Sequence, residues 1–414
     1  MPPVHAQLLP PQDLQVGCGW MLAFDPAQPG LGNTAYPDMN ARYWFAVVSD
    51  TAPAGSRLRM QGRFPDARYS AFHVHDGNLL VLDAVSDNQL LPDPGSANRN
   101  LDRTRRDDQI SAGGAYTAYV RINATVPAVR ETNTLYRPRP GLLDSKVKKR
   151  TAIAYRTYLA EGGNQGGVPL PALTLETPLG PKPLPHAADA ATCAEIQRQL
   201  YQDGAAIPVS LSPPLLPPAM PVFQKFDDSF LKAAGLGVGY NPHNGFMAIK
   251  SDRDFADFLL IRGKLPSYTT QVQPQPIPQV RYWSLCQYGA NSTKVYGCLA
   301  DQRLKLDADG NYNVVVSRDL QRPAALPARY DWLAWGPEKQ GGVMIRELLA
   351  HPTFAQSIEK SSTATAAADR GPYMPLATYC SQAVLVSASA TPGAGPADVF
   401  AACRASRLGL LLPY

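Results

Sequence analysis

Short runs in which apolar and polar residues alternate recur along this chain, and most are bounded by glycine, proline, aspartate or asparagine. A period of two places apolar side chains on one face of an extended segment, which is typical of β-strands. The pattern predicts strands over residues 42–49, 56–62, 68–75, 115–122, 245–250, 258–262, 280–288, 295–300 and 312–317. Asp76-Gly77 and Asp309-Gly310 are typical hairpin-turn dipeptides. The predicted fold is mainly β, with antiparallel, jelly-roll-like β-sandwiches.

The chain also carries an internal duplication. The frame Pro-x-x-Arg-Tyr that ends at Tyr69 recurs at Tyr282. Further landmarks follow both frames in the same order, pairing 86–90 with 300–304 and Arg156 with Arg346. The period of about two hundred residues is too long for a solenoid or propeller unit, so each copy is domain-sized. We therefore expect two related β-sandwich domains.

Composition shifts divide the chain further. We expect an N-terminal extension over 1–32, a first sandwich over 33–162, a proline-rich linker over 163–232, a second sandwich over 233–350 and a C-terminal helical or extended tail over 351–414. A capping box of Thr192 and Glu195 predicts one helix inside the linker. Short helices are expected over 352–360 and 396–406.

The bulk composition is that of a folded protein. Hydrophobic residues make up 45% and charged residues 18% of the 414 residues, while the 40 prolines are about twice the usual share. The net charge of +5 is mild, and the basic runs at 103–106 and 146–150 are local, so we expect no nucleic-acid partner. No run reaches eighteen uninterrupted apolar residues, so no membrane span is expected.

The cysteines indicate the compartment. Cys286 and Cys298 lie equally far from Ser292, and a hairpin turning there would place them opposite each other, close enough to bridge. The pairs that would complete an even set are Cys380 with Cys403 and Cys18 with Cys193, although sequence leaves connectivity open. Without a Cys-x-x-Cys motif, a zinc ribbon is not expected. An extracytoplasmic location, periplasmic or secreted, follows.

His73 and His75 are candidate metal ligands. Alternate residues of a strand point to one face, so two imidazoles could bind a divalent or transition metal ion, with Asp76 directly after them. A third ligand would come from a distant histidine or carboxylate. The second copy has Cys286 and Tyr288 at the matching positions, which favours the alternative that His73 and His75 pack within a sandwich.

Both copies keep an arginine at the start of a strand and an aspartate after it: Arg68 with Asp87, and Arg281 with Asp301. Residues shared by two otherwise different copies serve a shared fold more often than one active site. We therefore expect an Arg–Asp pair bridging strands within each domain. The alternative is that the two arginines anchor a ligand.

Several of these segments resemble a group of proteins. Residues 62–69, 92–96, 281–286, 309–312 and 331–333 are similar to those of uncharacterised bacterial extracytoplasmic β-sandwich proteins. That group is itself distantly similar to the paired domains of unknown function twelve fifty-four and twelve fourteen. The resemblance covers both copies but neither the linker nor the tail. It implies a β-sandwich fold and no established activity, and the group's domain order need not apply to a duplicated chain with cysteines.

These patterns predict an extracytoplasmic binding protein that holds a small molecule or glycan in the cleft between two sandwiches, since pockets favour domain interfaces. Aromatic rings on the strands could contact such a ligand. One alternative is a metal-dependent oxygenase or hydrolase, or a glycosidase-like enzyme, in the same cleft. Another is a structural subunit of an envelope assembly. The expected ligand-binding residues are His73, His75, Asp76, Arg68, Arg281, Tyr282 and Trp283.

Overall fold

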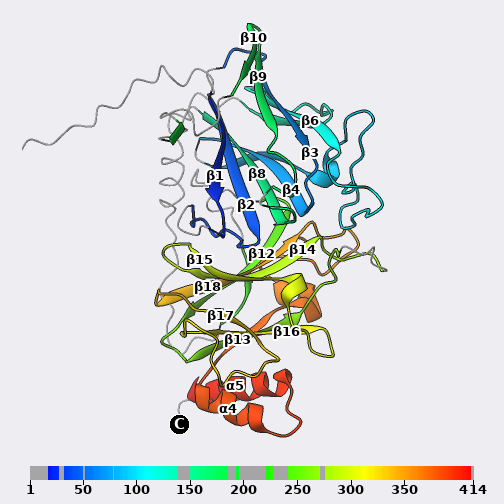
Figure 1. The fold of residues 1–414 in the computed structure, drawn as a ribbon. Helices are drawn as coiled ribbons and strands as arrows, with labels where there is room; N and C mark the ends of the chain where they lie inside the picture. Colours follow the sequence, from blue (N-terminus) through cyan, green and yellow to red (C-terminus); the bar gives the residue numbers. More distant parts are fainter. Residues whose placement is uncertain are drawn as a thin grey trace, which may run out of the picture.

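The computed structural model describes residues 17–27, 32–49, 52–77, 79–138, 150–163, 165–184, 193–194, 221–226, 241–270 and 276–411. It confirms a mainly β fold made of two sandwiches that are stacked one on the other (Figure 1). In the side view of Figure 1 the two sheets of the first domain lie above the two sheets of the second. A pair of helices near the C-terminus forms the lowest layer.

The first domain contains ten strands in two sheets. Its inner sheet, which faces the second domain, has the order β1-β2-β8-β4-β5, and its outer sheet has the order β10-β9-β3-β6-β7. The strands are β1 (Gly17–Phe24), β2 (Ala41–Ser49), β3 (Arg57–Arg63), β4 (Ala67–His75), β5 (Val81–Ser86), β6 (Ala115–Ile122), β7 (Thr134–Arg137), β8 (Arg150–Ala160), β9 (Ala172–Thr177) and β10 (Gly180–Pro183).

The second domain repeats this topology. Its inner sheet has the order β11-β12-β18-β14-β15 and its outer sheet the order β17-β16-β13-β19, so that every described strand except β10 has a counterpart. The strands are β11 (Gln224–Lys225), β12 (Asn244–Asp252), β13 (Phe258–Lys264), β14 (Tyr282–Gly289), β15 (Val295–Ala300), β16 (Asn311–Ser317), β17 (Asp331–Ala334), β18 (Gln340–Leu348) and β19 (Leu376–Cys380).

Burial alternates along β6 of the first outer sheet but not along the central strands of the inner sheets. In β6 every second residue is buried, and those residues pack into the core between the two sheets of the first domain. In β4 and β14 every residue is buried. These central strands have one face on their own core and the other on the neighbouring domain. A mixed cluster on that second face, including Tyr69, Tyr158, Tyr282 and Leu348, joins the two domains.

Two helices cover the far end of the stack. Helices α4 (Gln382–Ala390) and α5 (Pro396–Leu411) pack on the outer sheet of the second domain through Phe258, Leu260, Leu385 and Phe400 (Figure 1). The short α3 (Ala366–Arg370) precedes β19. The 3-10 turns η2 (Asp87–Gln89) and η4 (Asp301–Arg303) follow β5 and β15 at matching places, and η5 (Gly371–Tyr373) follows α3.

Most local predictions agree with these elements. All nine predicted strands have a counterpart, and the expected helix over 396–406 lies within α5. The predicted helix over 352–360 is wrong, since that segment forms successive turns. Its Ile358 amide donates to the buried carboxylate of Glu347 on β18, a long-range bond that fixes the segment's path. The helix predicted from Thr192 lies outside the described residues apart from 193–194.

Three disulfides are present: Cys18–Cys193, Cys286–Cys298 and Cys380–Cys403. They are the pairs that the sequence suggests, and Cys286 lies directly opposite Cys298 on paired strands. Such bonds persist outside the reducing cytoplasm, so the protein is not cytoplasmic. Among the described residues, no helix is both long and apolar enough to cross a membrane.

Candidate functional site

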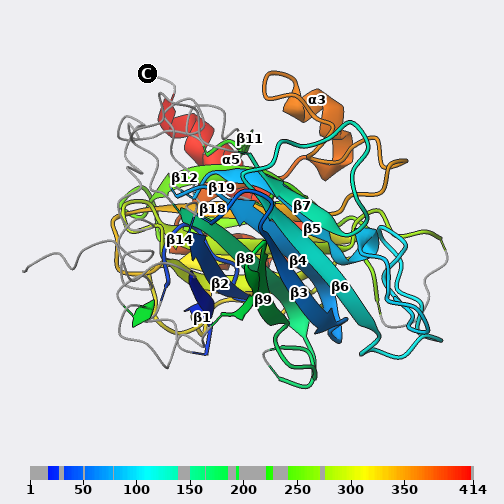
Figure 2. The same ribbon diagram turned by 90° about the horizontal axis from the view of Figure 1, so that it is seen from above.

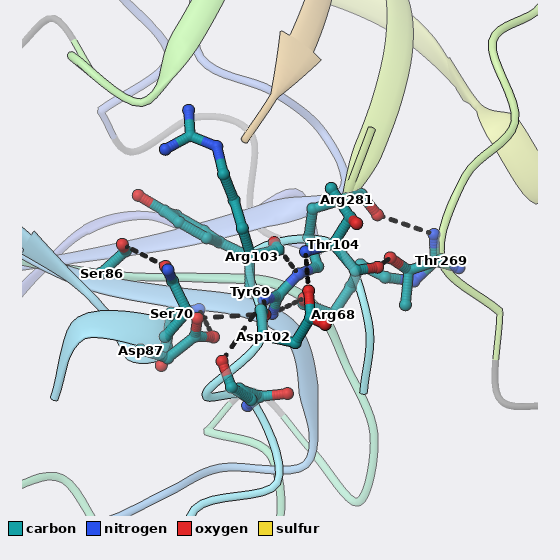
Figure 3. Close-up of polar contacts among 12 residues, drawn as sticks. Arg68, Tyr69, Ser70, Ser86, Asp87, Asp102, Arg103, Thr104, Thr269 and Arg281 are labelled. Carbon is teal, nitrogen blue, oxygen red and sulfur yellow. Dashed lines mark hydrogen bonds and ion pairs between the residues drawn. The ribbon is translucent and has the colours of Figure 1, made fainter. Parts of the chain in front are cut away.

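The arginines and aspartates shared by the two copies meet at the interface between the domains (Figure 3). Arg68 on β4 pairs with Asp301 of the second domain, with 3.2 Å between Nη1 and Oδ2. Arg281, just before β14, pairs with Asp87 of the first domain, with 3.4 Å between Nη1 and Oδ1. The prediction of one pair within each domain is therefore wrong, because the two domains exchange their arginines.

Each aspartate also accepts a hydrogen bond from a backbone amide of its own domain. The amide of Ser70 donates to Asp87 at 2.8 Å, and the amide of Trp283 donates to Asp301 at 2.9 Å. One carboxylate thus ties a central strand of its own domain to an arginine of the other. All four charged side chains are at least nine-tenths buried.

Arg281 has further acceptors on a long loop of the first domain. Its Nε donates to the Arg103 carbonyl at 2.8 Å, and its Nη2 donates to the carbonyls of Asn100 and Asp102 (Figure 3). The Thr269 hydroxyl donates to the Thr104 carbonyl of the same loop. Charge-assisted bonds to fixed carbonyls are stronger than neutral ones, so this loop extends the contact between the domains.

Burial dominates the acid–base properties of this interface. Desolvation raises the pKa of Asp87 to about 6, although the Arg281 charge and the Ser70 amide oppose it. The pKa of Asp301 is also raised by burial, against the opposing charge of Arg68. Burial lowers the pKa of Arg281. The exchanged pairs therefore carry a desolvation cost that their hydrogen bonds offset.

A second reciprocal contact uses the tyrosines that follow these arginines. The Tyr282 hydroxyl donates to Asp38 of the first domain at 2.9 Å. The Tyr69 hydroxyl contacts Asn241 at 3.4 Å and the Nδ1 atom of His243 at 2.7 Å, both in the second domain. The sequence repeat includes these segments, but the sequence did not indicate that the two tyrosines bind across the domain interface.

His73 and His75 lie on the face of β4 that turns away from its own core, and both are fully buried. Their rings lie 6.1 Å apart, and the His73 ring is 5.7 Å from that of His243. The ring nitrogens of His73 have no hydrogen-bond partner among the described residues, whereas the His75 ring interacts with the backbone of Ala152. Burial, assisted by the Arg156 charge, lowers the pKa of His75 to about 3 and that of His73 well below its usual range.

The other predicted site residues have structural contacts. Trp283 is part of the second domain's core. Asp76 lies in the turn after β4 and accepts the Leu80 amide at 2.9 Å. Tyr282, Arg68 and Arg281 bind across the interface as described. The structure thus brings His73 and His75 together, and the ring nitrogens of His73 have no hydrogen-bond partner among the described residues.

Two further features lie away from the histidines. Asp38, Cys286 and Cys298 place three ligand-type atoms within 4.8 Å of one another, but the cysteines form a disulfide and leave no metal site. A pocket of about 420 Å³ is lined by β5, β7 and the loop that contains Arg130. Its arginine already pairs with Asp83.

The outer sheets of the two domains differ on their outward faces. In the first domain β3 and β6 lie side by side in this sheet (Figure 2). Their outward surface, termed here the arginine face, carries Arg57, Arg59, Arg63, Tyr119 and Arg121. In the second domain Phe258 and Leu260 hold the positions of Arg57 and Arg59, and α4 and α5 cover them. Sequence reasoning missed this contrast, although the alternating arginines of β3 were a signal.

Contacts on the arginine face leave donors open to solvent. Arg57 and Arg59 share Glu176, at 2.7 and 3.2 Å from their Nε atoms. Their terminal nitrogens form no hydrogen bond within the described part of the chain. The Arg57 guanidinium lies 4.1 Å above the Tyr119 ring. Four arginines face three carboxylates here, those of Glu176, Glu131 and Asp93.

Comparisons with known proteins concern the fold. No family model matches the chain, and no curated protein matches it. A crystal structure of an uncharacterised protein from Burkholderia cenocepacia is similar over 88% of this chain and 82% of its own, with 14% identity and a TM-score of 0.53. The VPA0106 protein from Vibrio parahaemolyticus aligns over 83% of this chain and 89% of its own, with 14% identity and a TM-score of 0.39. The chain therefore shares its fold with an uncharacterised bacterial protein.

Proposed function

We propose that this protein is a periplasmic or secreted binding protein that holds an acidic glycan on the arginine face of its first domain. The observation behind this proposal is the contrast between the two copies. In one outer sheet Phe258 and Leu260 are covered by the chain's own helices, whereas the other has the partly exposed Arg57 and Arg59 at the same positions, next to Tyr119. We infer that the outer sheet of the first domain, which keeps the fold of its copy but exposes arginines, serves a different partner on its outward face.

The interface between the domains supports an outward site. Large side chains of both inner sheets are buried against each other, and the exchanged pairs hold the sheets together. A glycan reaches an outer sheet without separating the domains. The small-molecule site in a cleft, the metal-dependent enzyme and the envelope subunit remain predictions.

The chemistry of the arginine face fits carboxylated sugars. A planar guanidinium group binds a carboxylate through two parallel hydrogen bonds. Arg57 and Arg59 share one glutamate, so a glycan carboxylate can take up their remaining donors. Tyr119 adds an aromatic ring of the kind that contacts sugars. Because these groups are exposed to solvent, salt should weaken binding.

We expect the full-length protein to bind polygalacturonate, a carboxylated polysaccharide, and not neutral dextran, in titration calorimetry at low salt. The double variant Arg57→Gln/Arg59→Gln should weaken this binding by about tenfold, because it removes two charged contacts of about 0.7 kcal/mol each.

The matched control is Arg318→Gln/Arg329→Gln, which removes two exposed arginines from the second domain. It should leave the affinity unchanged. Equal binding of dextran, absence of binding to either polysaccharide, or equal loss in both double variants would overturn the proposal.

A further inference from the structure

Several of the residues beside His73 and His75 in the sheet are small. In the sheet register His73 lies between Ala84 on β5 and Ala154 on β8. Ala152 lies beside His75. At the matching places the second domain has Cys298 and Met344 beside Cys286, and these larger groups fill the same face. Around His73 the first domain therefore has an imidazole between two alanines where its copy has a disulfide and a methionine, while Tyr288 and Gly342 match His75 and Ala152.

The buried ring nitrogens need partners. A polar group that is buried without a hydrogen bond destabilises the folded protein. Native structures therefore satisfy nearly all such groups with protein, water or a bound ion. His73 and His75 are 0% exposed, and the described residues offer the nitrogens of His73 no hydrogen bond. Whatever satisfies the His73 nitrogens therefore lies outside the described part of the chain.

His243 brings a third imidazole from the second domain. Its ring lies 5.7 Å from that of His73. The Tyr69 hydroxyl donates to Asn241 and is therefore able to accept a proton from Nδ1 of His243, 2.7 Å away. This arrangement leaves the Nε2 lone pair of His243 free, and metal-binding histidines commonly donate their other nitrogen to such an acceptor. His243 is only partly buried, which gives the cluster access to solvent.

We propose that His73, His75 and His243 bind one first-row transition metal ion, Cu²⁺ or Zn²⁺, between the two domains. Imidazole suits both ions, and affinity for copper is the higher of the two in most nitrogen sites. The rings do not yet converge on a common point, so metal binding requires them to turn. The nearby Arg156 charge works against a cation and should limit the affinity.

The site is tested with chelator-treated full-length protein, titrated separately with Cu²⁺ and Zn²⁺ and then desalted. We expect one ion per chain by elemental analysis, with nitrogen ligands visible in the copper electron paramagnetic resonance spectrum. His75→Tyr, which introduces the residue type found at Tyr288 in the second domain, should weaken binding at least tenfold. His243→Ala, at a partly exposed position, should do the same.

His351→Ala is the matched control, because His351 lies on the second domain and contacts only Thr353 through its ring. It should bind metal like the unchanged protein. If His75→Tyr fails to fold, His243→Ala decides the result alone. Loss of the ion on desalting, or equal affinity in the unchanged protein and His243→Ala, would overturn the proposal. This outcome is independent of glycan binding, since the arginine face belongs to the other sheet of the domain.

Discussion

Replacing Arg281 by methionine should lower the free energy of unfolding by about 3–5 kcal/mol, the range measured when one partner of a buried ion pair is removed. Methionine fills much of the same volume but donates no hydrogen bond. Asp87 would stay buried without its cation, and the carbonyls of Asn100, Asp102 and Arg103 would lose their donor. Urea denaturation followed by tryptophan fluorescence measures this loss.

Arg370→Met is the matched control, because Arg370 is equally buried but pairs with Glu347 of its own domain, at 2.7 Å. It should destabilise the protein to a similar degree. Hydrogen exchange should separate the two variants: Arg281→Met exposes amides of β4 and β14, whereas Arg370→Met acts on β18 and residues 351–375. A loss below about 1 kcal/mol for Arg281→Met would show that the exchanged pair does not hold the domains.

Acid should stabilise the unchanged protein relative to Asp87→Asn. Burial raises the folded-state pKa of Asp87 to about 6, above the ordinary 3.8. The folded protein therefore binds this proton at a pH where the unfolded chain has released it. The resulting stabilisation is fully present below pH 3.8 and is lost as the pH rises through 6. Between pH 7 and pH 4.5 the difference in unfolding free energy should change by about 2 kcal/mol in favour of the unchanged protein.

Other titrating groups are common to the two proteins and cancel in this difference. Asp301→Asn should behave in the same direction, because burial also raises the pKa of Asp301. A difference that stays constant with pH, or that falls on acidification, would mean that Arg281 controls Asp87 more strongly than burial does.

The strands with one exposed face could be predicted from sequence, and the strands buried on both faces were harder. Alternation identified β6 directly, since buried and partly exposed residues alternate along the whole strand. The central strand β8 was missed because its first nine residues are all buried, so no alternation marks it. The short β7 and β17 pair in parallel with β6 and β16 after a crossover, and a four-residue strand carries too little pattern to be recognised.

The exchange of arginines could not be predicted for a different reason. Each copy contains both an arginine and an aspartate, so pairing within a domain and pairing between domains require the same sequence. Only the packing of the inner sheets decides between them. The same limit applies to His243, which joins His73 and His75 only because the second domain is stacked on the first.

The interface is tested most directly by a double-mutant cycle on Arg281 and Asp87, residues that belong to different domains. The free energy of unfolding is measured for the unchanged protein, Arg281→Met, Asp87→Asn and the double variant. If the exchanged pair holds the two domains together, the coupling energy should be at least about 2 kcal/mol, within the range of close buried charge pairs. Effects that add to within about 0.5 kcal/mol would contradict the account, because additivity is the behaviour of independent sites.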